Sequence, residues 1–300
     1  MSKVFVNVKL CSTDFLGFRI GGAGLGNILF PWARAVIFAK KNNLEIIDPT
    51  WSTYKIGTYI RGEIDKRTYK GIFLSKNIKG FKKFLLLLFS KKIKEKEVNS
   101  NTIFEGKWWK VINFEGMSDQ MTDIIDDYEI VKKELYKIVE PSHLVVGSIN
   151  KSDHIAVHIR LGDFYLPQDE QEIRDGAFSC RLPLQWYIEI IDKIRTKFNE
   201  NLLVKVFSDG NEDQLRDILV LPNVERVSGG SAISDLLSLS QSKILIASNS
   251  TFSLWASYLG RNNTIWFPGT HRVKLFKDYE NVFEGEVDYN DDLSKVLFKN

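Results

Sequence analysis

The second half of the chain alternates short apolar runs with amphipathic segments. From His154 to Arg160 apolar residues occupy every second position, which is the period of a β-strand. Further apolar runs predict strands at 203–207, 224–227, 243–247 and 264–267. Between them, apolar spacing and capping residues predict helices at 183–198, 212–219, 233–239 and 250–260, the last with Gly260 at its C-cap. This alternation with short loops predicts an α/β fold with a parallel, doubly wound sheet.

The first half is less regular but begins in a similar way. Alternating valines predict an opening strand at 4–8, and a glycine-rich turn at 21–27 leads into a helix over 28–41 with Asn27 as its N-cap. A short strand follows at 44–47, and Ser118 or Asp119 is expected to cap a helix that reaches Val139. The polar stretch 147–153 is the best linker, which predicts one domain over 1–149 and a second over 150–300.

Composition narrows the classes of protein. The 41 basic and 38 acidic residues give a net charge of only +3, which does not suggest a nucleic-acid partner. Two cysteines provide neither a disulfide framework nor a zinc cluster, so we expect a reducing, cytoplasmic environment. The N-terminal stretch does not have the pattern of a signal peptide, and no apolar run approaches the roughly 20 residues that span a bilayer.

One segment of the first half is strongly basic. Residues 75–97 carry eight lysines around the apolar run Phe84–Phe89. A solvated helical hairpin would explain the pattern, and a surface that contacts a membrane or an anionic acceptor is the sharper interpretation. Trp108 and Trp109 follow, and they fit a sugar-binding surface or a pair of core side chains equally well.

Polar residues gather where three predicted strands of the second half end. In a doubly wound sheet, ligands bind at the carboxyl ends of the strands. These polar positions are His158, Arg160 and Asp163 after one strand, Ser208 and Asp209 after the next, and Ser248–Thr251 after a third. Arg160 alone would be explained by a structural ion pair. Together with hydroxyls and a helix N-terminus, an arginine fits a phosphate-bearing ligand better, most simply a diphosphate.

The glycine-rich turn supports a competing hypothesis. Gly22 to Asn27 nearly match G-x-G-x-x-G, and Asp48 lies at the distance of a ribose-binding acid, which would suit a nicotinamide or flavin oxidoreductase. A tight turn that lets the next helix pack closely is the simpler explanation. The chain has no P-loop, no G-x-S-x-G and no D-x-D triplet, so we expect a leaving diphosphate to be neutralised by Arg160, hydroxyls and a helix end without a metal.

Four motifs, in this order, resemble those of the family 11 glycosyltransferases, the α-1,2-fucosyltransferases of bacterial surface glycans and animal glycoconjugates. They lie at 24–30, 158–164, 207–209 and 248–259. The resemblance implies a GT-B-like fold, in which two Rossmann-like domains with parallel sheets face each other across a cleft. It also implies GDP-fucose as the donor, no metal, and inversion at the anomeric carbon. It makes the oxidoreductase a minor alternative.

The resemblance also implies roles for individual residues. Arg160 would bind the donor diphosphate. Apart from the resemblance, Asp163 is our candidate base for the acceptor hydroxyl; it could equally be an ion-pair partner that holds Arg160, with a phosphate oxygen taking the proton. The remaining donor contacts would come from His158 and Asp209 towards the guanine and from Asn249, Ser250, Thr251 and Phe252 at the helix end. Gly24, Gly26 and Asn27 would line the cleft from the first, acceptor-side domain.

The chain departs from the family pattern at several positions. Leu161 stands where a second arginine is usual, Phe164 where tyrosine is usual, and Gly210 where a second acid is frequent. Ile28 and Pro31 replace glutamines. These departures leave another GDP-sugar as an alternative donor. The acceptor, expected to be a surface glycan, an oligosaccharide or a lipid-linked glycan, is not specified by the sequence.

Overall fold

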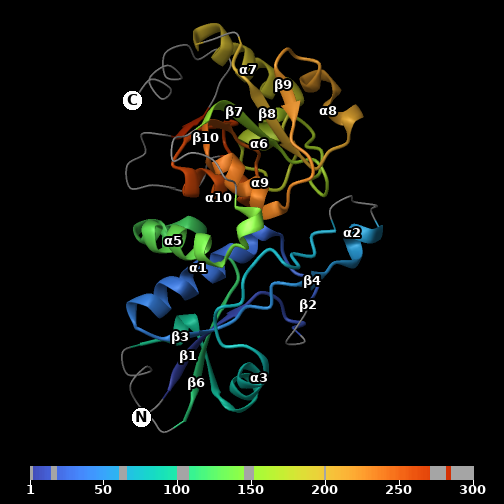
Figure 1. Cartoon of the computed structure of the whole chain (residues 1–300). Coiled ribbons are helices and arrows are strands. Elements are labelled where there is room, and N and C mark those ends of the chain that lie inside the picture. The colour runs from blue at the N-terminus through green and yellow to red at the C-terminus, as the bar shows by residue number, and fades with distance from the viewer. Residues whose placement is uncertain are drawn as a thin grey trace. The chain divides into compact units, whose positions relative to one another are not determined.

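The computed structural model describes residues 3–14, 19–60, 66–99, 108–144, 152–198, 201–270 and 282–284. The chain divides into two compact units, Met1–Leu144 and Val145–Asn300, here called unit 1 and unit 2. The sequence pattern predicts the boundary slightly later, between 149 and 150, and most of the expected linker lies outside the described residues. Each unit contains its own parallel sheet (Figure 1).

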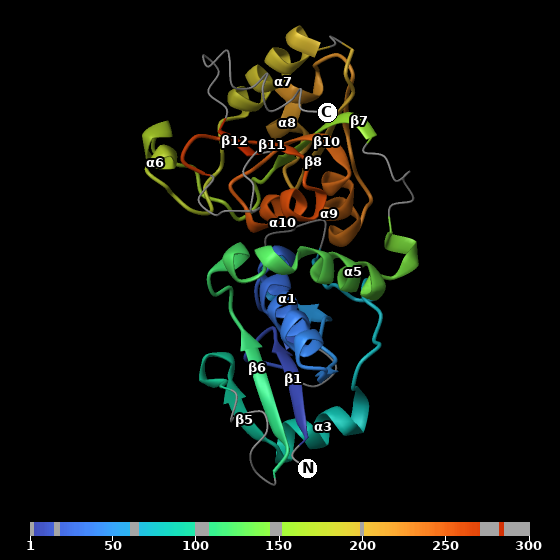
Figure 2. The same ribbon diagram turned by 90° about the vertical axis from the view of Figure 1, so that its left-hand side faces the viewer.

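Unit 1 is built on a four-stranded parallel sheet in the order β3-β1-β6-β5 (Figure 2). Its strands are β1 (Val4–Lys9), β3 (Glu45–Ile47), β5 (Lys91–Lys94) and β6 (Lys110–Glu115). A second, two-stranded parallel sheet joins β2 (Arg19–Ile20) to β4 (Thr53–Tyr54). The helices of this unit are α1 (Leu25–Lys41), α2 (Ile56–Ile60), α3 (Gly80–Phe89) and α5 (Tyr128–Ile138).

Helices cover both faces of the four-stranded sheet. On one face α1 contributes Phe38, whose ring centroid lies 5.5 Å from that of Phe114 in β6. On the other face α3 contributes Leu86, which packs in a buried cluster with Phe5 of β1 and Val111 of β6. Because side chains alternate along a strand, β1 supplies apolar groups to both helices, as expected for a buried parallel sheet.

Three local predictions for unit 1 are wrong. Helix α1 begins at Leu25, because the carbonyl of Gly24 already accepts the amide N–H groups of Asn27 and Ile28 at 3.1 Å, and Gly24, not Asn27, is the N-cap. Before α5 the chain forms two short 3₁₀ helices, Gln120–Asp123 and Ile125–Asp127, in place of the first part of the expected helix. The basic segment is not a helical hairpin, because α3 is followed by the strand β5, which pairs with β6.

Unit 2 has a six-stranded, fully parallel sheet in the order β12-β11-β10-β7-β8-β9. The strands are β7 (Ser152–Ile159), β8 (Val204–Ser208), β9 (Val224–Arg226), β10 (Ser242–Ile246), β11 (Asn263–Trp266) and β12 (Val282–Glu284). Along the chain, β7, β8 and β9 therefore run from the middle of the sheet to one edge, and β10, β11 and β12 run from the middle to the other edge. The strand order reverses between β7 and β10, which is the switch point of a doubly wound sheet.

Helices cover both faces of this sheet too. They are α6 (Glu170–Arg174), α7 (Leu184–Phe198), α8 (Glu212–Leu219), α9 (Ala232–Ser240) and α10 (Thr251–Gly260). One face of β7 packs with α7 and α8 in a large core, while Ala156 on the opposite face packs with Leu239 of α9 and Ala256 of α10. The α/β fold with parallel sheets predicted from the sequence is confirmed.

Gly260 has a different role from the one expected. It is the last residue of α10, and Arg261 is the C-cap, with a φ of 44°. A Cβ on Gly260 would overlap the backbone of Ser240 at the end of α9. The glycine is therefore needed for the close approach of two helices and not for a left-handed turn.

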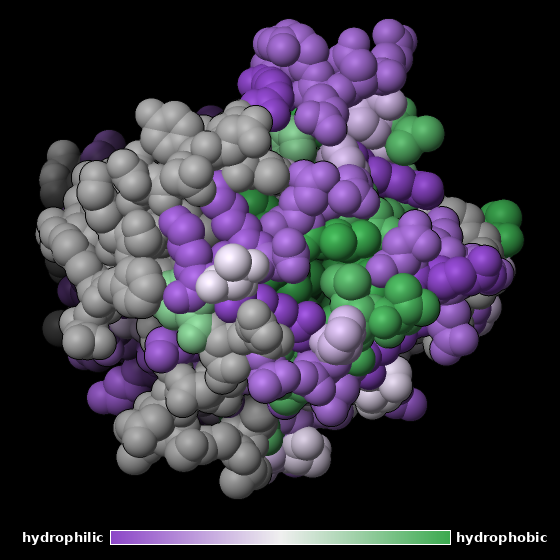
Figure 3. Space-filling model, turned by 90° about the horizontal axis from the view of Figure 1, so that it is seen from above, coloured by the Kyte–Doolittle hydropathy of each residue, from purple (hydrophilic) through white to green (hydrophobic). Residues whose placement is uncertain are grey.

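Polar side chains cover most of the described surface in Figure 3, where they surround one apolar area. Several large apolar side chains of the chain are exposed, including Phe81, Phe89 and Trp108. Within the described ranges, no helix has both the length and the apolar character needed to cross a membrane.

Candidate functional site

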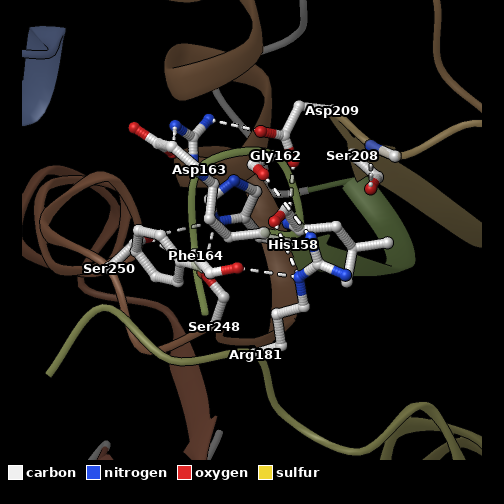
Figure 4. A network of polar contacts seen from close by, with 12 residues as sticks. His158, Gly162, Asp163, Phe164, Arg181, Ser208, Asp209, Ser248 and Ser250 are labelled. Atoms are coloured by element: carbon white, nitrogen blue, oxygen red, sulfur yellow. Dashed lines mark hydrogen bonds and ion pairs between the residues drawn. The ribbon is translucent and has the colours of Figure 1, made fainter. Parts of the chain in front are cut away.

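The carboxyl ends of three neighbouring strands bring the predicted polar residues of unit 2 together. Strand β7 pairs with β10 on one side and with β8 on the other, all in parallel. Arg160 directly follows β7, Asp209 directly follows β8, and the serine-rich turn 248–250 follows β10. Figure 4 shows Asp209, Ser248 and Ser250 close together with His158 and Asp163, where these strands end. Residues about 90 positions apart in the sequence are thus within hydrogen-bond distance.

Arg160 is held between two carboxylates. Its Nη1 lies 2.7 Å from Oδ2 of Asp209, and its Nη2 contacts Oδ1 of Asp163. The guanidinium lies over the ring of Phe164, 5.4 Å from the ring centroid. The side chain is 19% exposed, so it is oriented by protein groups and still reaches solvent. A guanidinium fixed in this way suits recognition of an anion with several oxygens.

The second oxygen of Asp209 fixes the backbone next to Arg160. Asp209 Oδ1 accepts a hydrogen bond of 2.8 Å from the backbone N–H of Leu161. One carboxylate therefore orients both the guanidinium and the peptide that follows it. Asp209, at the end of β8, is therefore part of the same site as Arg160 at the end of β7.

Arg181 is a site residue that sequence reasoning missed. Its Nε donates to the carbonyl oxygens of Leu161 at 2.9 Å and Phe164 at 2.8 Å. Its Nη2 lies 3.5 Å from the carbonyl oxygen of Gly162. These carbonyls belong to the loop that carries Asp163, so Arg181 holds this loop in place through its backbone (Figure 4). An isolated arginine in a polar loop gives no sequence signal for this role.

Serine hydroxyls organise the turn between β10 and α10. Ser250 is the N-cap of α10 and accepts the backbone N–H of Ser253 at 3.3 Å. The Ser253 hydroxyl in turn accepts the backbone N–H of Ser248 at 3.0 Å. Ser253 was not predicted, although its position three residues after an N-cap serine is the spacing of a capping box. The start of α10 is therefore rigid, and its first N–H groups and positive dipole end favour an anion.

His158 joins this turn to β7. Its Nδ1 lies 2.8 Å from Ser253 Oγ and 2.9 Å from Ser248 Oγ, and its ring centroid is 5.0 Å from that of Phe252. Burial, reinforced by the positive charge of Arg160, lowers the pKa of His158 to about 3. The imidazole is therefore neutral near pH 7, and it connects two elements of the site without adding charge.

The remaining predicted donor residues lie at the start of α10. Thr251 and Phe252 are half-buried residues of its first turn, and Phe252 also packs against the core formed with α9. The side-chain amide of Asn249 donates to the carbonyl oxygen of Ala177 at 2.7 Å, so this group supports a neighbouring loop. Binding of a donor by these residues stays a prediction.

The predicted glycine-loop residues belong to unit 1, at the start of α1. Gly24 is the N-cap, and Gly26 and Asn27 lie in the first turn. Arg19 is fully buried behind this loop and donates from Nη1 to the Gly21 carbonyl oxygen at 3.1 Å. Gly22 has a φ of 90°, and a Cβ there would overlap Arg19. The loop is thus a tight turn built over a buried arginine.

Three solved structures are similar to this chain. The chain is similar to NodZ α-1,6-fucosyltransferase soaked with GDP-fucose, with a TM-score of 0.50 and 12% identity over 89% of this chain and 95% of that chain. Fucosyltransferase NodZ from Bradyrhizobium has a TM-score of 0.48 and 13% identity, covering 86% and 94%. A mutant of Arabidopsis thaliana FUT1 in complex with GDP has a TM-score of 0.46 and 11% identity, covering 94% and 73%.

Comparison of the sequence with protein families identifies the chain more directly. None of the curated proteins matches it. The model of Glycosyl transferase family 11, by contrast, matches residues 90–282. This range is more than half of the chain, and it includes Arg160, Asp209 and the turn that leads into α10. Three of the four motifs that suggested the resemblance lie within this range, and the motif at 24–30 lies outside it. The resemblance itself is confirmed, and the chain belongs to glycosyl transferase family 11.

Proposed function

We propose that this glycosyltransferase moves L-fucose from GDP-fucose to a sugar hydroxyl, with inversion and in α-1,2 linkage. Family membership supports the reaction class, and the similar NodZ structure was soaked with GDP-fucose, which supports the donor. The observation that carries the proposal is the position of Arg160, fixed by two carboxylates at the end of β7, which pairs with the strand that leads into α10. The acceptor in this proposal is a surface glycan, an oligosaccharide or a lipid-linked glycan.

In this proposal the donor diphosphate lies between Arg160 and the N-terminus of α10. A guanidinium has five N–H donors, so it can keep its contacts to Asp163 and Asp209 and still donate to phosphate oxygens. Ser250 and Thr251 add hydroxyls at the helix end. Asp209 acts by positioning Arg160. His158 stays neutral, so Arg160 is the positively charged residue from the end of β7 that binds the diphosphate in this proposal.

The reaction follows from where charge develops. The acceptor hydroxyl oxygen forms a bond to the anomeric carbon while the bond from that carbon to the diphosphate oxygen breaks, and its electron pair remains on the GDP. Arg160 and the α10 terminus stabilise this negative charge more in the transition state than in the bound donor. The acceptor proton passes to Asp163 or to a phosphate oxygen. No metal is assigned a step in this proposal.

Donor transfer and donor binding can be tested separately with one pair of variants. We expect Arg160→Ala to abolish transfer from GDP-fucose while the protein remains folded by circular dichroism. The matched control is Arg216→Ala, because Arg216 is an exposed arginine in a local ion pair with Asp213 of α8. Thermal shifts with GDP, UDP, NAD and GDP-fucose measure binding, because a ligand of the folded state raises its stability.

Several results would contradict the proposal. Near-normal transfer by Arg160→Ala would remove the diphosphate assignment. Turnover of GDP-mannose but not GDP-fucose would assign another donor sugar, and loss of activity in EDTA would show a metal requirement. For Asp163→Asn, a loss in kcat across the pH range supports the base, whereas an increase in the KM for the donor with little change in kcat supports a role in orienting Arg160.

A further inference from the structure

Helix α3 of unit 1 carries apolar side chains on two opposite faces. Leu86 is buried against the sheet. Phe81, Phe84, Leu85 and Leu88 follow the spacing i, i+3, i+4 and i+7, which places them in a second stripe along the helix. Phe81 is 74% exposed and Leu88 57%, so this stripe faces solvent. A surface helix normally has polar residues on that side, so the stripe marks a candidate interaction surface.

Aromatic side chains outside the helix extend this stripe. Trp109, Phe5 and Phe81 line one hollow of about 240 Å³ beside α3. The backbone carbonyl of Trp109 accepts the N–H of Lys91 at 2.9 Å, which fixes this tryptophan next to the strand that follows α3. We call the exposed apolar set the α3 face; its members are Phe81, Phe84, Leu88, Phe89 and Trp109.

Lysines surround the α3 face. Lys3 and Lys82 line the same hollow as Phe81, Lys79 immediately precedes α3, and Lys91 closely follows it. All four are exposed. Lys83 does not contribute to this charge at the surface, because it is buried and donates to the Asp48 carbonyl oxygen and to Thr50 Oγ1.

Acidic residues of the same segment are largely engaged elsewhere. Glu95 forms a two-pronged ion pair with the buried Arg34, at 2.8 and 3.2 Å. A Glu97 oxygen accepts the backbone N–H of Lys94. Glu45 faces Lys82, but both side chains are about 60% exposed at 3.4 Å, so this pair neutralises little. The α3 face therefore presents exposed aromatics within a basic rim.

We propose that the α3 face docks on an anionic lipid surface. Exposed phenylalanines and Trp109 fit the boundary between headgroups and acyl chains, while lysines at the rim face anionic headgroups. A second copy of the chain fits less well, because a two-fold interface presents the same patch on both sides and would set lysines against lysines. Docking would hold the enzyme at a membrane through the α3 face.

Vesicle binding tests this proposal with the whole protein. Sedimentation is measured with vesicles of phosphatidylcholine alone and with vesicles containing phosphatidylglycerol, at low and high NaCl. We expect binding to the anionic vesicles only, weakened by salt. Lys82→Gln with Lys91→Gln should lower the partition coefficient about 25-fold, at about fivefold per lysine.

A second variant separates apolar insertion from charge. Phe81→Ser with Leu88→Ser leaves the charge unchanged and should abolish stable binding. The matched control is Val220→Ser, which removes an equally exposed apolar side chain at the end of α8 in unit 2. Circular dichroism confirms that each variant is folded.

The outcomes decide between partners. Equal binding to neutral and anionic vesicles, no binding to either, or loss of binding in the Val220 control would each overturn the proposal. A dimer in sedimentation velocity that Phe81→Ser with Leu88→Ser dissociates, without vesicle binding by the native chain, would assign the α3 face to self-association instead. None of these measurements uses a donor sugar, so they stand apart from the test of catalysis.

Discussion

The buried His158 should make unit 2 sensitive to acid well above the pH at which carboxylates protonate. In the folded protein its pKa is lowered to about 3, whereas an unfolded histidine titrates near its usual value of 6.5. Between these two values the unfolded chain binds a proton that the folded chain does not. Stability is therefore fully retained above pH 6.5 and declines as the pH falls towards 3.

The size of this effect follows from the two pKa values. Each unit of pKa difference corresponds to about 1.4 kcal/mol, so His158 alone should lower the free energy of unfolding by about 2 kcal/mol between pH 7 and pH 5. His154, at the start of the same strand, has its pKa lowered to about 4 by burial and by Lys205, and it adds a similar loss over this range. Together the two losses, about 4 kcal/mol, are a large fraction of a typical total stability of 5–15 kcal/mol.

Urea denaturation of the native chain and of His158→Gln at pH 7 and pH 5 measures the difference. Hydrogen exchange of the β7 peptide identifies the transition that belongs to unit 2. The variant should be less stable at pH 7, because Ser248 and Ser253 lose a partner, but its stability should fall about 2 kcal/mol less on acidification. His154→Gln should likewise lose about 2 kcal/mol less stability than the native chain between pH 7 and pH 5. An unchanged pH dependence in His158→Gln would refute a neutral, buried imidazole.

Three further predictions concern packing and positioning. Arg181→Met should raise the KM for the donor about tenfold with a smaller effect on kcat, because the loop around Arg160 loses the hydrogen bonds that hold it. Arg181→Lys should not restore the low KM, since a single amine cannot reproduce the guanidinium fork. Gly260→Ala should destabilise the protein by roughly 1–3 kcal/mol in thermal melts. Gly24→Ala, whose Cβ meets nothing, should cost less, because it loses only the preference of an N-cap for glycine over alanine. Gly210→Ala should be destabilising by a similar amount, and combining it with Leu161→Ala should remove most of the clash in a double-mutant cycle.

The sequence predicts the fold of unit 2 well, because its elements follow simple rules. Buried parallel strands such as β10 appear as continuous apolar runs, and the helices between them have clear caps or periodic apolar faces. Unit 1 is harder, because β5 is mostly lysine and is a strand only through its pairing with β6. That pairing is a tertiary contact, and the sequence pattern within residues 91–94 does not predict it.

Some residues of the candidate site can likewise be predicted from the sequence, and others cannot. Arg160 and Asp209 can be predicted together, because parallel strands place their carboxyl ends at one edge. Arg181 cannot, because it acts through backbone carbonyls of a loop whose conformation the sequence does not specify. His158 lies between these cases: its place on β7 is predictable, but its contacts with Ser248 and Ser253 depend on the register between β7 and β10.

Two departures from the family pattern turn out to be a single structural feature. Leu161 and Gly210 are 49 residues apart, yet a Cβ on Gly210 would lie 2.5 Å from Cδ1 of Leu161. Leu161 packs against the apolar core of unit 2, and its N–H is held by Asp209. An arginine and an acid at these positions would put opposite charges side by side at two strand ends, whereas this chain has an apolar side chain over a glycine. Because the site loses a positive and a negative group together, its net charge towards a diphosphate is unchanged. The paired replacement therefore leaves Arg160 as the guanidinium on which the proposed donor contact depends.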